Sequence, residues 1–307
     1  MKKYITLLVL VLAAFTQFVP ATGVFTAWAA DFAPVATISE LAPGVWAFVG
    51  ENGSTNSGFV VTSAGVVVID SQGPQARALL LKEKIKEVTD RPVTYLINTH
   101  YHGDHTFGNQ YFPGAAIVSH ANTRKLLVER DAAHRERFMG FFGPDSLKGF
   151  VLTLPSLTFT DRLTLRSGDT AIEIIYAGHP AHTTGDIFVF LPEEKVVFAG
   201  DLLYNGRLPL LDDGDSSGAI AVLDRLAETG AQRFVPGHGA VSGPEGVILY
   251  RGYLTELRAE VRWLKEKGRS LEEVRDAIEL PRYAGFVNYR EWLPANAAHI
   301  YRELESR

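Results

Sequence analysis

The chain has 307 residues and no cysteine, and its 30 basic and 35 acidic side chains give a formal charge of −5. This acidic balance argues against nucleic acid as a partner. Without cysteine the chain forms no disulfides and offers no thiolate to a metal ion. The length is sufficient for one large core or for a core with an appendage.

Residues 1–29 have the pattern of a secretory signal peptide. Two lysines form a basic start, Thr6–Val19 form an apolar centre, and Ala27-Trp28-Ala29 supply the small residues of a cleavage site. The alternative is an uncleaved anchor, but proline and glycine interrupt the apolar run before it reaches the about 20 residues that span a bilayer. We therefore expect a secreted, periplasmic protein that leaves the membrane after cleavage.

Hydrophobic periodicity predicts a mixture of strands and helices along the rest of the chain. Strands are predicted near residues 35–40, 44–50, 57–63, 65–70, 93–98, 115–118, 157–160, 162–166, 170–176, 186–191, 195–199 and 234–239. Helices are predicted at 74–89, 121–137, 216–229 (N-capped by Asp215 or Ser216) and 243–268, with further helix in 270–307. The glycine- and phenylalanine-rich segment 137–150 is predicted to be irregular. This order suggests two sheets with helices packed outside.

Residues 99–105 read Thr-His-Tyr-His-Gly-Asp-His and directly follow the predicted strand 93–98. Extended backbone places the histidines at 100 and 102 on one side, because side chains repeat every two residues. Gly103 can take the dihedral angles of a tight turn, which brings the next two residues back toward the same point. The candidate ligands are His100, His102, Asp104 and His105. Imidazole and carboxylate together suit zinc or a similar first-row ion. The alternative to a metal site is a polar loop that happens to be rich in histidine.

Three later segments place imidazole or carboxylate groups after predicted strands. They are 178–186 with His182, 196–201 with Asp201, and 234–239 with His238. A lone histidine or aspartate at such a position is usually a cap or a solvated turn residue, but four of these strand ends in one chain indicate a shared site. His120 has no matching ligand position, and His134 and His299 fall in helical patterns typical of surface or packing residues.

These motifs resemble those of the metallo-β-lactamase-fold hydrolase superfamily over most of residues 35–245. The resemblance implies an α/β fold in which a four-layer αββα sandwich forms the metal-binding domain, here 30–245. Residues 246–307 would then be a small C-terminal helical extension.

The resemblance also implies two metal sites. His100, His102 and His182 match the ligands of the first site, Asp104, His105 and His238 match those of the second, and Asp201 matches the carboxylate that bridges both ions. His182 is preferred to His179 because the superfamily ligand directly precedes a Thr-x-Gly-Asp sequence. Asp70 matches an aspartate that accepts a hydrogen bond from a ligand histidine. Two zinc ions are expected, with iron or manganese as alternatives.

The departures from the pattern narrow the comparison. Subclass B1 metallo-β-lactamases carry a cysteine where this chain has Asp201, so the site is more similar to glyoxalase II, lactonases and related dinuclear hydrolases. Residues 200–209, 280–285 and 299–304 resemble a periplasmic subgroup linked with quinoprotein and sulfur-oxidation systems.

The expected reaction is hydrolysis of a small-molecule ester, thioester, lactone or β-lactam by a hydroxide shared between the two ions. Asp104 would orient this hydroxide and relay its proton. Asn205 and Arg207 are candidate substrate contacts, although Asn205-Gly206 is equally a turn dipeptide. The apolar segment Phe138–Gly143 either covers the cleft and binds an acyl group or, as we favour, completes the core.

Two other functions remain open. An iron-dependent persulfide oxygenase would keep ligands like His100, His102 and His182 around one iron, but the complete second set weakens this reading. The other alternative is a non-catalytic periplasmic metal-binding accessory protein, on which the sequence is nearly silent. The oligomeric state is also left open.

Overall fold

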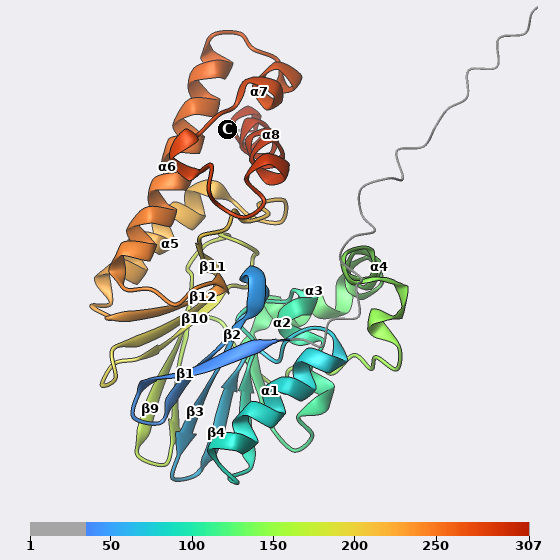
Figure 1. Ribbon diagram of the computed structural model, residues 1–307, viewed down its shortest axis with the longest axis vertical. Coiled ribbons are helices and arrows are strands. Elements are labelled where there is room, and N and C mark those ends of the chain that lie inside the picture. The colour runs from blue at the N-terminus through green and yellow to red at the C-terminus, as the bar shows by residue number, and fades with distance from the viewer. Residues whose placement is uncertain (1–34, 307) are drawn as a thin grey trace, which may run out of the picture.

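The computed structural model describes residues 35–306, so the predicted signal peptide lies outside the described residues. Two β-sheets lie face to face, and helices cover their outer faces (Figure 1). The predicted four-layer αββα sandwich is confirmed. No helix in the described part of the chain is both long and apolar enough to cross a membrane.

The first sheet has seven strands that lie side by side in chain order. They are β1 (Ala36–Ala42), β2 (Val45–Gly50), β3 (Ser57–Thr62), β4 (Gly65–Ile69), β5 (Val93–Ile97), β6 (Ala116–His120) and β7 (Leu157–Phe159). Strands β1 to β4 pair antiparallel, and β4 to β7 pair parallel. Helix α1 (Gln75–Val88) connects β4 to β5 and covers the outer face. The parallel arrangement brings the ends of β4, β5 and β6 to one edge of the sheet.

The second sheet has five strands in the order β12-β11-β10-β9-β8. Their bounds are β8 (Arg162–Ser167), β9 (Thr170–Tyr176), β10 (Ile187–Leu191), β11 (Val196–Asn205) and β12 (Arg233–Gly239). Only β11 and β12 pair parallel, and α5 (Ser216–Glu228) makes the crossover between them. The long helix α6 (Pro244–Glu266) follows β12 and packs against α5 and β11.

Three apolar clusters separate the four layers. Val67 and Ile97 of the first sheet meet Ile174 and Val189 of the second in the central cluster. A second cluster lies between the first sheet and α1, and a third lies between the second sheet and α5 to α8. Each fully buried aliphatic side chain contributes about 1.5–3 kcal/mol. The sheets therefore form a rigid support for the loops at their ends.

The predicted C-terminal helices are present. After α6 come α7 (Leu271–Ala277), a 3₁₀ turn at Pro281–Tyr283 and α8 (Tyr289–Glu305). These helices stand together beyond one end of the sandwich (Figure 1). The predicted domain boundary between 245 and 246 falls in the first turn of α6, and this division stays a prediction.

Two expectations about local structure are wrong. The predicted helix 121–137 is two helices, α3 (Ala121–Glu129) and α4 (Asp131–Phe142), which meet at Arg130 (φ −108°, ψ 5°). The segment predicted to be irregular from 137 is therefore helical as far as Phe142, and a 3₁₀ turn follows at Pro144–Leu147. The ring of Phe138 packs 4.9 Å from that of Phe107, so tertiary packing supports a helix that the composition did not indicate.

Strand β11 is also longer than expected, because it runs to Asn205 instead of ending near residue 199. Register shifts near Gly200 (φ 52°) let the strand pass the carboxylate of Asp201 and continue beside β12. Tyr204 pairs there with His238. Asp201 consequently lies inside a strand and not at its end.

Candidate metal centre

The segment after β5 turns sharply into the short helix α2 (Gly103–Thr106), which carries Asp104 and His105. A Cβ atom on Gly103 would lie 2.5 Å from the ring of Phe107, so a larger residue would displace that ring. The ring of His134, on α4, stacks parallel to that of His102, and its Nε2 accepts a hydrogen bond from the Gly103 amide at 2.6 Å. The tight turn therefore brings the four candidate ligands of this segment together, and α4 supports it from outside.

Four buried residues form the first group of candidate ligands. They are His100, His102, His182 and Asp201, whose ligand atoms all lie within 4.8 Å of one another. Nδ1 of His102 is 2.8 Å from Nε2 of His182, which in turn is 3.2 Å from Oδ2 of Asp201. His179, the alternative to His182, is exposed and lies outside this group.

Asp104, His105 and His238 form the second group. Oδ2 of Asp104 lies 3.4 Å from Nε2 of His105 and 3.3 Å from Nε2 of His238. Asp201 reaches this group as well, since its Oδ1 is 3.0 Å from Nε2 of His105 and its Oδ2 is 3.5 Å from Nε2 of His238. One carboxylate thus stands between two sets of ligands, which is the geometry that a bridging ligand requires.

The donor atoms themselves fit a metal ion. Among the described residues, Nε2 of His100, Nε2 of His105 and Oδ1 of Asp201 are buried and make no hydrogen bond of suitable geometry, although the last two atoms lie 3.0 Å apart. Burying a polar atom unsatisfied costs about 1–3 kcal/mol, and here three such atoms come from the two adjacent groups. Nitrogen and carboxylate oxygen are the donors that zinc takes in cysteine-free sites. The residues present therefore fit divalent ions of the zinc type.

The ring of His105 is held by Asp70. Oδ2 of Asp70 accepts a hydrogen bond from Nδ1 of His105 at 2.8 Å, while both carboxylate oxygens also accept from Thr99. Asp70 adopts a positive φ of 59°, which is uncommon for a residue with a side chain. These contacts leave Nε2 of His105 facing the candidate site, the arrangement that orients a metal-binding imidazole.

Two other histidines are oriented in the same way. Nδ1 of His100 lies 3.0 Å from Oγ1 of Thr99, and Nδ1 of His238 lies 3.1 Å from the carbonyl oxygen of Gly53. In both rings Nε2 is therefore the nitrogen that faces the ligand groups. His102 is reversed, because its Nδ1 faces His182 and its Nε2 is bound outside the group by Asp213.

Burial and charge set the protonation of the cluster. Burial lowers the pKa of His100 well below its ordinary value and lowers the pKa of His182 to about 4. Burial acts in the same direction on His105, but the carboxylates of Asp201, Asp104 and Asp70 outweigh it and raise the pKa of that ring. Neutral imidazole is the form that binds metal, so a cation can take the place of the proton on His105.

Several residues of this region were missed by sequence reasoning. Asp213 contacts His102, the Tyr204 hydroxyl donates to Oδ2 of Asp201, and the Thr55 hydroxyl donates to Oδ2 of Asp104 at 2.7 Å. Asp213 lies in a run of aspartates before α5 that resembles a helix cap, and Asp215 is in fact that cap. No local signal distinguishes one aspartate from the other.

The two candidate substrate contacts are engaged within the protein. Nδ2 of Asn205 donates to the carbonyl of Ala240 at 2.9 Å. Arg207 donates to the carbonyl of Gly53 at 2.9 Å, and its guanidinium group lies 4.9 Å from the ring centre of Trp292. Arg207 thereby holds the 3₁₀ turn Glu51–Gly53 whose carbonyl also contacts His238. A substrate role for either side chain stays a prediction.

The apolar segment 138–143 has two different faces. Phe138 is buried against Phe107 and Phe142, whereas Phe141 and Phe142 are 46% and 38% exposed.

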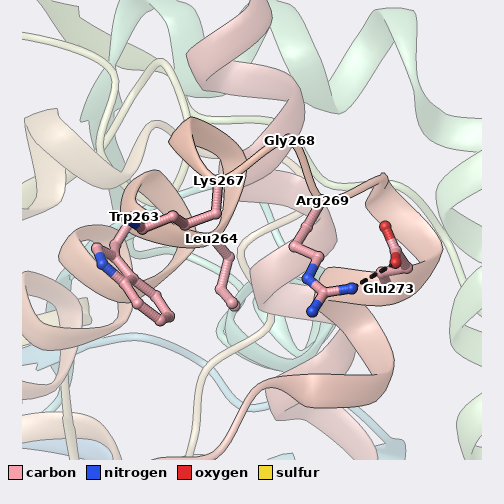
Figure 2. A pocket seen from close by; sticks show the side chains of 6 residues that line it. All are labelled: Trp263, Leu264, Lys267, Gly268, Arg269 and Glu273. Carbon is pink, nitrogen blue, oxygen red and sulfur yellow. Dashed lines mark hydrogen bonds and ion pairs between the residues drawn. The ribbon is translucent and has the colours of Figure 1, made fainter.

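A separate hollow of about 440 Å³ lies at the turn from α6 to α7 (Figure 2). It is lined by Trp263, Leu264, Lys267, Gly268, Arg269 and Glu273, none of which is a candidate ligand.

Comparisons with known proteins agree with this geometry. A family model described as the metallo-beta-lactamase superfamily matches residues 50–238, which include every candidate ligand. The metallo-beta-lactamase type 2 of Bacteroides fragilis is 26% identical over 205 residues, covering 65% of this chain and 73% of that protein. A linear primary-alkylsulfatase of a Pseudomonas species is 20% identical over 284 residues, which cover 78% of this chain but only 53% of the sulfatase.

The fold is also found among solved structures. A metallo-beta-lactamase from Pontibacter korlensis matches with a TM-score of 0.59 at 21% sequence identity. The match covers 72% of this chain and 99% of that one. At this level of identity the likeness concerns the fold alone.

Proposed function

The chain belongs to the metallo-β-lactamase superfamily and is a metal-dependent hydrolase, and on this premise we propose a secreted enzyme that binds two zinc ions and cleaves a carbonyl-type bond. The observation that carries the proposal is the position of Asp201 between two complete ligand groups. A single tetrahedral zinc site takes four protein ligands at most. Seven converging ligand residues therefore favour two ions over one.

When bound, the two ions would supply a hydroxide nucleophile at neutral pH and polarise the substrate carbonyl. Asp104 is the residue best placed to handle the proton. Its side chain is 23% exposed, against 4% for Asp201, so water and substrate reach it. The Thr55 hydroxyl fixes its Oδ2, and His105 and His238 stabilise its charged form. Asp104 is therefore held in its charged form, in which it can accept a hydrogen bond from the nucleophile and orient it. Its part in relaying the proton stays a prediction.

The charge of Asp201 sets the substrate class. A buried carboxylate between the ions makes them less electrophilic than a neutral ligand would. Such a site favours substrates whose leaving group needs little stabilisation, namely thioesters, activated esters and lactones. Ordinary amides need more, and strained β-lactams lie between. The distant likeness to both a lactamase and a sulfatase is consistent with a site whose substrate the fold does not determine.

The sequence supports a location and a class of partner for this proposal. The predicted signal peptide supports a periplasmic enzyme, and the acidic charge and the ligand cluster support a small-molecule substrate and not nucleic acid. The family match also supports a small substrate.

The test combines elemental analysis with side-by-side kinetics on a thioester, an activated ester, a lactone and a penicillin at neutral pH with added zinc. We expect close to two zinc ions per chain, faster turnover of the ester-type substrates than of the penicillin, and loss of both activities with a chelator. A penicillin kcat/KM of about 10⁴–10⁸ M⁻¹s⁻¹ with inert esters would establish a lactamase instead.

Two other outcomes would overturn the proposal. One tightly held iron without a second ion would favour the persulfide oxygenase. Bound metal without turnover of any substrate in the panel would favour an accessory protein.

A further inference from the structure

The 209–216 loop, which runs from beyond the end of β11 to the first residue of α5, lies against the first ligand group. Oδ2 of Asp213 is 3.0 Å from Nε2 of His102 and accepts a hydrogen bond from the hydroxyl of Tyr101. Its other oxygen accepts from the guanidinium group of Arg130 at 2.7 Å. Because Nδ1 of His102 faces His182, the proton of the neutral ring belongs on Nε2, where Asp213 receives it.

The same loop contacts the segment that carries His182. The amide of Asp215 donates to the carbonyl of Ala181 at 2.9 Å. A Cβ atom on Gly214 would lie 2.2 Å from that carbonyl oxygen and 3.1 Å from the carbonyl oxygen of His182. The loop is therefore pressed against the backbone of one ligand while its carboxylate binds the ring of another.

Helix α8 supports the start of the loop through one buried amide. Oδ1 of Asn296 accepts from the amide of Leu211 at 3.3 Å, and its Nδ2 donates to the carbonyl of Pro209 at 3.0 Å. The same Nδ2 is 3.0 Å from the hydroxyl of Tyr253 on α6. Two helices of the C-terminal region thus fix the backbone that leads into Asp213.

The end of the loop is held by a buried ion pair. Glu303 of α8 accepts hydrogen bonds from the amide and hydroxyl of Ser216, and it pairs with Arg258 of α6 at 2.7 Å. Nε2 of His299 lies 3.2 Å from the carbonyl oxygen of Gly214. Both ends of the loop are therefore attached to the C-terminal helices.

We propose that Asp213 is a positioning residue for His102, and that the C-terminal helices hold the 209–216 loop in place for this purpose. The inference rests on the proposed metal centre and extends it. An imidazole that donates its outer N–H to a carboxylate is fixed in orientation and becomes a more basic ligand. The C-terminal helices thereby contribute to metal affinity although none of the candidate ligands lies on them.

The first test is zinc titration of the full mature protein against a chromophoric chelator. Asp213→Asn should weaken binding of one of the two ions by about 10- to 100-fold and leave the other unchanged, because only one ligand group contains His102. Asp212→Asn is the matched control, since Asp212 is exposed and pairs with Arg137 outside the ligand groups. Circular dichroism of the metal-free variants checks that the fold is intact.

A second variant tests the support from α8. Asn296→Ala should weaken the same ion by several-fold without changing the other. If Asp213→Asn binds both ions as tightly as the unaltered protein does, the positioning role is wrong. If the unaltered protein binds fewer than two ions, the proposed metal centre fails, and any change in the affinity of a remaining ion in Asp213→Asn still decides the role of Asp213.

Discussion

Tyr204 donates a hydrogen bond from its hydroxyl to Oδ2 of Asp201, and its ring stacks on that of His238 with 5.2 Å between ring centres. Burial and the nearby Asp201 carboxylate raise the pKa of Tyr204 well above its ordinary value, so the phenol keeps its proton at neutral pH and donates it to Asp201. This bond restricts the rotation of Asp201 and directs Oδ1 toward His105. One tyrosine thus orients the carboxylate shared by both ligand groups.

Replacing Tyr204 with phenylalanine should therefore affect both ions together. We expect Tyr204→Phe to lower zinc affinity by about 10-fold at each site, because it removes a partner of a ligand and leaves the ring in place. Zinc titration measures this directly. Tyr250→Phe is the control. Tyr250 is buried and its ring centre lies 5.7 Å from that of Tyr204, but it does not hydrogen-bond to a candidate ligand among the described residues. Unchanged affinity in Tyr204→Phe would show that the metal ions alone orient Asp201.

Alanine variants of His182 and His179 distinguish a metal ligand from a residue that does not bind metal. His182→Ala should lose one ion per chain and nearly all hydrolysis, because His182 is buried among the candidate ligands. His179→Ala should keep both, because His179 is exposed. Elemental analysis after gel filtration and one kinetic assay on each variant make the comparison. Equal loss in the two variants would mean that His179 has a role that its position does not indicate.

The candidate ligands were predictable because each stands in a local pattern. At His100 and His238, for example, the ligand follows a buried strand and a turn within a few residues. Such a pattern can be recognised in the sequence alone. Asp213 and Tyr204 could not be found in this way. Asp213 reaches His102 across 111 positions of sequence, and its importance depends on where the 209–216 loop is attached.

The predicted bounds of some elements were wrong for a similar reason. The Asp201 carboxylate suggested an early end for β11, but buried Leu202 and Leu203 and pairing with β12 carry the strand past it to Asn205. Helix α4 likewise depends on contacts of Phe138 with distant rings. Tertiary packing decided these cases, and local propensity did not.

The helical state of α4 can be tested at Gly140. This glycine lies inside the helix, and a Cβ atom there would meet nothing within 4 Å. Gly140→Ala should raise the free energy of unfolding by about 0.5–1 kcal/mol, since alanine loses less backbone entropy. Urea unfolding of the mature protein measures the difference. A lower stability for the alanine variant would contradict the helix at 131–142.

The contact between His299 and Glu303 predicts a pH dependence of stability. The hydrogen bond to Glu303 raises the pKa of His299 and outweighs the opposing effect of burial. The stabilisation is therefore complete below the pKa of the unfolded chain, about 6.5, and is lost as pH rises through the folded value. His299→Gln cannot be protonated and should lose about 0.5 kcal/mol at acidic pH, the usual size of such a pair.

Urea unfolding of both proteins at about pH 6 and about pH 9 gives the comparison, since these values bracket the titration of histidine. The difference between the unaltered protein and His299→Gln should shrink toward zero at the higher pH. A difference that is the same at both pH values would show that the proton on His299 contributes nothing and that the contact is a neutral hydrogen bond.

The candidate ligands come from both sheets: His100 and His105 follow β5, whereas Asp201 and His238 lie on β11 and β12. Ions held between them would cross-link the two sheets and close a chain loop of more than a hundred residues. Their binding free energy would therefore add to the free energy of folding. Each ligand group is complete only after the two sheets have docked, because residues 100–105 come from the first sheet and the other ligands come from the second. Full metal affinity would therefore arise late in folding. A chain exported unfolded would therefore take up its ions in the compartment in which it folds. It would lose them when the two sheets separate.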